Sequence, residues 1–152
     1  MSARTAKDVM TTQVLCAYEG WAIQRLDHFL KRHELARVPV IASDHQLVGS
    51  VSSADIYCLM QMDETYRAQM VNDNFRRNTG HDVDNLDELT QWTRRAHVYC
   101  TVHQIMQPDA LQLDEGVSIE LVRQTLKQAK ANVLWLTRNG LLSGQISAHQ
   151  LL

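Results

Sequence analysis

The sequence predicts a mixed α/β fold made of two copies of one β-α-β-β-α unit, with a long helical insertion between them. Residues 37–56 read as two short strands joined by a polar turn and followed by a helix start, and residues 133–147 read as a degraded copy of that pattern. Residues 60–97 keep a roughly helical spacing of apolar residues but match neither copy. A repeated supersecondary unit is informative about architecture, because one copy alone often cannot bury its apolar face.

The two copies align at a nearly constant spacing along the chain. The spacing is 96 positions up to the hairpin and 95 after it, because the second copy lacks one turn residue. We therefore expect repeat 1 over residues 1–59, a helical insertion over 60–97 and repeat 2 over 98–152. Matched residues include Met10 and Met106, Glu19 and Glu115, Ile23 and Ile119, Leu30 and Leu126, Leu47 and Leu142, Gly49 and Gly144, and Ser52 and Ser147.

Repeat 1 is predicted to begin with a short helical lead-in over 5–10, followed by a strand over 14–16. A helix over 21–34 follows, because its apolar residues recur at helical spacing. The strands 38–41 and 47–51 are apolar and largely β-branched. Gly49 in the second of them indicates that something lies close to the backbone there.

The insertion continues a helical rhythm from about Ala54 to Phe75, interrupted at Asp63 and Glu64, and a further helix is predicted over 86–96. Three of the six methionines of the chain, Met60, Met62 and Met70, fall in this segment. They are consistent with ordinary core filling and equally with an adaptable surface for a partner or a second copy of the chain.

Repeat 2 is predicted to repeat the same order of elements. A lead-in over 102–106 ends before Pro108, and a short strand includes Leu111 and Leu113. A helix over 117–130 and strands over 133–137 and 141–146 follow, with the hairpin signal Asn139-Gly140 between the strands. The closing helix is cut short at the end of the sequence.

Composition excludes several classes of function. A net charge of -2 and a pI near 6.4 give no electrostatic case for nucleic-acid binding. No apolar run is long enough to span a membrane, and three widely spaced cysteines fit a reducing cytoplasm. We find no metal-ligand spacing, no phosphate-cradling glycine loop and no nucleophile–base set, so we expect neither a metal site nor an enzyme.

The candidate site is the strand-to-helix junction Ser52-Ser53-Ala54-Asp55. A hydroxyl and a carboxylate three residues apart can face one small ligand, and the free N–H groups of a helix start suit a phosphate. The same residues can instead simply cap the helix. The two readings are compatible, so both remain open.

The ordered, repeated set of motifs resembles the CBS domain pair, here as a stand-alone protein. The residues that carry the resemblance are Val9-Met10-Thr11, Val38-Pro39-Val40 and Leu47 to Ser52 with Asp55 in repeat 1, and Ile105-Met106, Leu134-Trp135-Leu136 and Leu142 to Ser147 in repeat 2. The resemblance implies two α/β repeats packed sheet to sheet around a pseudo-two-fold axis with clefts between them. It also implies a homodimer and a regulatory role in sensing AMP, ADP, ATP or S-adenosylmethionine, with no required cofactor.

The resemblance also assigns roles to residues. It implies that Asp55 holds ribose hydroxyls, that Ser52 contacts ribose or phosphate, and that the backbone of Val38, Pro39 and Val40 meets adenine. Repeat 2 departs from the pattern, with Gln150 at the Asp position and Trp135 at the Pro position. We therefore expect one competent site, built on repeat 1, and one degenerate site, with Trp135 either filling a cleft or offering a stacking surface.

Three functions compete at this point. The first is an adenine-nucleotide sensor, and the second is a protein-interaction module that uses residues 60–97. The third, a metal or redox sensor using His and Cys residues, has the least support from the sequence. A homodimer is expected in part because residues 56–75 would leave an apolar helix uncovered.

Overall fold

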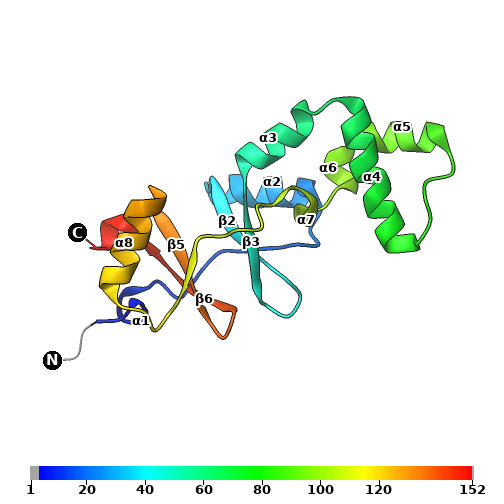
Figure 1. Cartoon of the computed structure of the whole chain (residues 1–152). Coiled ribbons are helices and arrows are strands. Elements are labelled where there is room, and N and C mark those ends of the chain that lie inside the picture. The colour runs from blue at the N-terminus through cyan, green and yellow to red at the C-terminus, as the bar shows by residue number, and fades with distance from the viewer. Residues whose placement is uncertain (1–3, 152) are drawn as a thin grey trace.

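The computed structural model describes residues 4–151, which form two three-stranded sheets flanked by helices (Figure 1). The first sheet has the order β1 (Ala17–Tyr18), β2 (Arg37–Ile41) and β3 (Leu47–Ser52). The second has the order β4 (Gln112–Asp114), β5 (Val133–Arg138) and β6 (Leu141–Ser147). In each sheet the first pairing is parallel and the second is antiparallel, so the two repeats share one topology.

The similarity of the two sheets extends to an irregularity in each hairpin. The pairing register shifts between Val40 and Ile41 in the first sheet and between Leu136 and Thr137 in the second, which are matched positions of the repeat. The predicted α/β fold with duplicated units is therefore confirmed. The prediction was wrong about the first strand, which is Ala17–Tyr18 and not residues 14–16.

Each sheet buries one face under its own helix. In repeat 1, α2 (Ile23–Arg32) places Leu26 and Leu30 against Val38, Val40 and Val51. In repeat 2, α8 (Ile119–Ala129) contributes Val122 and Leu126 to the corresponding core. The helical spacing of apolar residues in both helices thus becomes the side that packs on a sheet. The chain ends in a short 3-10 helix over Ala148–Leu151.

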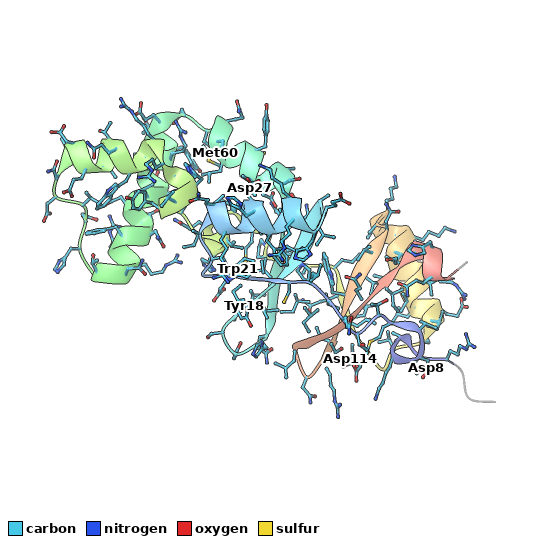
Figure 2. All side chains as sticks on the ribbon, turned by 180° about the vertical axis from the view of Figure 1, so that it is seen from behind. Asp8, Tyr18, Trp21, Asp27, Met60 and Asp114 are labelled. Atoms are coloured by element: carbon cyan, nitrogen blue, oxygen red, sulfur yellow. The ribbon has the colours of Figure 1, made fainter. Side chains whose placement is uncertain are left out.

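The two lead-in helices are exchanged between the repeats. Ala6 of α1 (Ala6–Val9) is buried in the core of repeat 2, and Val102 of α7 (Val102–Ile105) is buried in the core of repeat 1. Figure 2 shows Asp8 of α1 near Asp114 of β4, at the repeat 2 end of the molecule. Each core is therefore complete only when the other repeat is present.

The exchange of the lead-in segments explains why glycine stands at the matched positions 49 and 144. The segment after α7 bonds to β3, with Gln107 N donating to Ser50 O at 2.8 Å, and Thr11 bonds to Gln145 in the same way. A Cβ atom on Gly49 would collide with the backbone carbonyl of Gln107, and one on Gly144 would meet Met10 Sδ at 2.5 Å. The glycines thus give room for the crossing lead-in segments.

Residues 53–99 form a helical cluster on repeat 1: α3 (Ser53–Gln61), α4 (Glu64–Thr79), α5 (Leu86–Arg94) and α6 (Ala96–Tyr99). Asp63 caps α4 through Tyr66 N at 2.8 Å, which explains the break in the helical rhythm. Leu59, Val71, Ala96 and Cys100 form a buried core with Ile23 of α2. The expectation of an uncovered apolar helix over 56–75 was wrong for its inner face, which packs against α2, α5 and α6, whereas Tyr57 and Tyr66 on the outer face are exposed.

No helix within residues 4–151 is both long enough and apolar enough to cross a membrane.

Candidate functional site

Ser52 and Asp55 form a reciprocal capping box at the start of α3. Ser52 Oγ accepts a hydrogen bond from Asp55 N at 3.2 Å, and Asp55 Oδ2 accepts from Ser52 N at 2.9 Å and from Ser52 Oγ at 3.1 Å. The capping role considered from the sequence is therefore present. It engages one carboxylate oxygen, Oδ2, and leaves the other, Oδ1, directed elsewhere.

The second carboxylate oxygen of Asp55 meets the exchanged segment from repeat 2. Gln107 Nε2 donates to Asp55 Oδ1 at 3.2 Å. The backbone of Gln107 is held by the paired bonds to Ser50, so its side chain is positioned beside the carboxylate. This contact joins the predicted site to the boundary between the two repeats.

A cleft of about 1000 Å³ lies at that boundary. This volume lies at the upper end of small-molecule sites, so the cleft is large enough for a nucleotide. Gln107 lines it and bonds to Asp55, whereas Asp55 and Ser52 are not among its lining residues. Its lining residues come from both repeats and from the segment between them: Leu35, Ala36, Arg37, Ser50, Gln107, Asp109, Ala110, Leu111, Gln112, Ala129, Ala131, Asn132, Val133, Trp135 and Gln145.

The charged groups of the cleft lining are Arg37 and Asp109. Arg37 Nη1 donates to Ser50 Oγ at 2.8 Å, and Arg37 forms no ion pair with any residue from 4 to 151. A guanidinium that bonds only to a hydroxyl keeps donors free for an anionic ligand. Asp109 adds a negative charge to the same cleft, so a ligand that carries both charges can also be accommodated.

Trp135 forms part of the wall of the cleft that repeat 2 provides. Its side chain is 5% exposed and packs with Leu47 and Ala110, with Val14 and Leu142 at the edge of the cluster. The indole N–H is buried and finds no acceptor among the described residues. Trp135 thus fills space between the repeats, and its use as a stacking surface stays a prediction.

The matched junction of repeat 2 is organised differently. Gln150 Oε1 accepts from Ser147 N at 2.8 Å, and its Nε2 donates to Val9 O at 3.2 Å and lies 3.4 Å from Thr11 Oγ1. One amide therefore caps the chain and binds the exchanged lead-in at the same time. A neutral amide in this position offers a ribose diol a weaker acceptor than a carboxylate does.

The other predicted site residues lie away from the cleft surface. Val38 and Val40 are buried in the repeat 1 core, Pro39 is buried on β2, and Ser53 is exposed at the start of α3. The cleft instead uses Ala36 and Arg37, just before β2, together with Ser50 and Gln107. Sequence reasoning missed Gln107 because its closeness to Asp55 arises only from the exchange of the lead-ins.

No cluster of His, Cys, Asp or Glu suited to a metal ion is found across residues 4–151.

Comparison with known proteins identifies the first repeat. Residues 6–60 match the family model described as CBS domain. Among curated proteins, no sequence matches the chain.

Similar solved structures span the whole chain at low sequence identity. A putative acetoin utilization protein (AcuB) from Vibrio cholerae is 13% identical with a TM-score of 0.68, covering 98% of this chain and 87% of that one. CBSX2, solved in complex with AMP, is 21% identical with a TM-score of 0.66, covering 97% of this chain and 92% of that one. The CBS domain pair of MJ0100, solved with 5-methylthioadenosine and S-adenosyl-L-methionine, is 12% identical with a TM-score of 0.61, covering 99% of this chain and 94% of that one.

Proposed function

Residues 6–60 belong to the CBS domain family and the whole chain has the fold of a CBS domain pair, and from this premise we propose a non-catalytic regulatory module that senses an adenine nucleotide. The proposed ligand site is the cleft between the repeats, beside Asp55. The candidate ligands are AMP, ADP, ATP and S-adenosylmethionine. Adenine-containing ligands are present in the solved structures of CBSX2 and MJ0100.

The observation that carries the proposal is the bond between Asp55 and Gln107, a residue that lines the cleft. Gln107 Nε2 donates to Asp55 Oδ1 at 3.2 Å, and Gln107 is the residue that links this carboxylate to the lining of the cleft. A ribose diol is a pair of donors, and an ionised carboxylate only accepts. Rotation of the Gln107 side chain would let the diol replace the amide on Oδ1 while Oδ2 keeps its capping bonds.

Arg37 is the proposed partner of the phosphate. It is the cation of the cleft lining and bonds to Ser50 Oγ. Arginine binds phosphate through charge-assisted hydrogen bonds, which are shorter and stronger than neutral ones. The nearby Asp109 would favour the positively charged sulfonium of S-adenosylmethionine instead, so Arg37 and Asp109 variants separate the two classes of ligand.

The proposed stoichiometry is one ligand per chain. Only the first repeat offers a carboxylate at the helix junction, since Gln150 stands at the matched position. The structure also places Trp135 on the repeat 2 side of the same cleft. Binding of two equivalent ligands per chain would contradict this part of the proposal.

A thermal-shift and calorimetric panel with AMP, ADP, ATP and S-adenosylmethionine tests the proposal on wild type, Asp55→Ala and Asp63→Ala. Asp63 is the matched control, because its carboxylate also caps a helix but bonds to Tyr66, which does not line the cleft, whereas Asp55 bonds to the lining residue Gln107. We expect at least one ligand to raise the melting temperature of wild type and of Asp63→Ala. No response to any of the four, or an unchanged response in Asp55→Ala, would refute the assignment.

The second candidate function is a protein-interaction module that uses residues 60–97. Leu86 of α5 is 76% exposed and Tyr66 of α4 is 58% exposed, so this segment presents apolar side chains to a partner. Deletion of residues 60–97 should then abolish complex formation while any nucleotide binding survives. We expect the module to work as a homodimer in the cytoplasm, with a further protein partner as the alternative.

A further inference from the structure

The surface of repeat 2 carries a basic groove that the nucleotide proposal leaves unused. The groove has a volume of about 500 Å³ and runs along the C-terminal half of α8 and the 3-10 helix at the end of the chain. Its floor is apolar, formed by Leu126, Ala131, Ala148 and Leu151. Its cations are Arg123, Lys127 and Lys130, and no carboxylate belongs to its lining among residues 4–151.

The two lysines of this groove are available to a partner. Lys127 and Lys130 are exposed, and neither forms an ion pair within residues 4–151. Arg123 is already bonded to Glu120 at 2.7 Å, so it is partly neutralised. A groove with this composition fits a segment that carries an apolar side chain between acidic ones.

A segment of that description exists elsewhere in this chain. The turn into α5 carries Asp84, Asp87 and Glu88, all exposed, around Leu86. Leu86 is 76% exposed, which is the highest value for a large apolar side chain among the described residues. We call residues 84–88 the acidic tip.

One chain cannot bring its own tip to its own groove. The tip belongs to the helical cluster that packs on repeat 1 through Ile23, Val71 and Ala96. The loop before α5 and the helix α8 lie at opposite ends of the molecule (Figure 1). The occupant must therefore come from another molecule.

We propose that the acidic tip of one chain docks in the basic groove of a second copy of this chain. Leu86 would enter the apolar floor, while Asp87 and Glu88 face Lys127 and Lys130. In the proposed arrangement the two chains are antiparallel and related by a two-fold axis, so that each tip meets the other chain's groove and the pair closes as a dimer. This inference rests on the homodimer of the proposed function and names its interface. It requires no ligand, so its test is independent of nucleotide binding.

Charge reversal followed by mixing tests the proposal. One variant carries Lys127→Glu with Lys130→Glu, and the other carries Asp87→Lys with Glu88→Lys. Each variant alone sets like charges against each other in both contacts, so self-association should weaken roughly tenfold or more, as expected for several charge pairs of up to about 1 kcal/mol each. In an equimolar mixture each tip meets a groove of opposite charge, so a dimer should form again.

The control for the lysine variant is Lys7→Glu with Arg138→Glu, which lowers the net charge by the same amount outside the groove. Sedimentation velocity at low and high salt measures the association, and melting curves confirm that each variant is folded. Leu86→Asp, at a position where no core packing is lost, should also weaken the dimer.

The expected result is a wild-type dimer that salt weakens, two weakened variants, an unaffected control and recovery in the mixture. A wild-type monomer, a mixture that does not recover, or variants no weaker than the control would overturn the proposal. Growth into open chains with concentration would overturn the closed two-fold arrangement.

Discussion

Gly49→Ala tests whether the exchange of lead-in segments holds the two repeats together. The added Cβ would collide with the backbone carbonyl oxygen of Gln107, and would lie 3.3 Å from Gln107 C and from Met106 Sδ. Because the nearest atom belongs to the backbone, the crossing segment must move and cannot simply change a rotamer. Overpacking of this kind costs about 1–3 kcal/mol.

The movement also strains two hydrogen bonds. Ser50 N donates to Gln107 O at 2.9 Å, and Gln107 N donates to Ser50 O at 2.8 Å. Each is worth about 1 kcal/mol, so weakening both by about half, added to the overpacking, should lower the free energy of unfolding by about 2–4 kcal/mol in total. The same shift pulls Gln107 Nε2 away from Asp55, so ligand affinity should change together with stability.

Urea unfolding of three alanine variants provides the measurement. Gly144→Ala meets mainly the side chain of Met10, which can move, so we expect about 1–2 kcal/mol. Gly20→Ala meets nothing within 4 Å and serves as the control, within about 0.5 kcal/mol of wild type. If Gly49→Ala unfolds at the same urea concentration as Gly20→Ala, the crossing segment does not hold the repeats as described.

Further predictions concern the cap, the thiols and the tryptophan. Ser52→Ala should cost about 0.5–2 kcal/mol in urea unfolding, because Asp55 N loses its acceptor. Burial raises the pKa of the Cys100 thiol to about 11, so at pH 8 this thiol is less ionised than an ordinary one. A thiol reagent should therefore label the exposed Cys58 in the folded protein and reach the buried Cys100 only on unfolding. Mass spectrometry of the labelled protein measures both. Trp135→Ala should cost about 3–5 kcal/mol, whereas Trp135→Phe should cost less than about 1.5 kcal/mol, since the lost indole N–H has no acceptor within the described part of the chain.

The sequence predicted the elements that carry strong periodicity. Helices α2 and α8 and the hairpin strands agree with the predicted ranges to within a few residues, because a long amphipathic helix and a run of β-branched residues are read directly from spacing. The first strand was misplaced, since two residues paired to a sheet edge leave no pattern of their own. Asp63 marked a real break, because a helix cap is a local signal.

The site was less accessible to prediction because it depends on contacts distant in sequence. Ser52 and Asp55 were found by their local motif, and their capping geometry is local as well. Gln107 lies 52 residues from Asp55 along the chain and has no motif. Only the fold, in which each lead-in crosses to the other repeat, brings the amide to the carboxylate.

The segment from Thr101 to Gln107 links three parts of the molecule that the sequence treats as separate. Val102 completes the repeat 1 core, Gln104 Nε2 donates to Met70 O of α4 at 2.7 Å, and Gln107 bonds to Ser50 and Asp55. A ligand that displaces Gln107 from Asp55 therefore acts on a segment that also holds the helical cluster. Such a ligand can shift the equilibrium between two arrangements of that cluster only by the difference between its affinities for them. Since the acidic tip belongs to the same cluster, ligand binding in the cleft and association of two chains would then be coupled through these seven residues. Ligand binding would change the free energy of association, and association would change the free energy of ligand binding by the same amount.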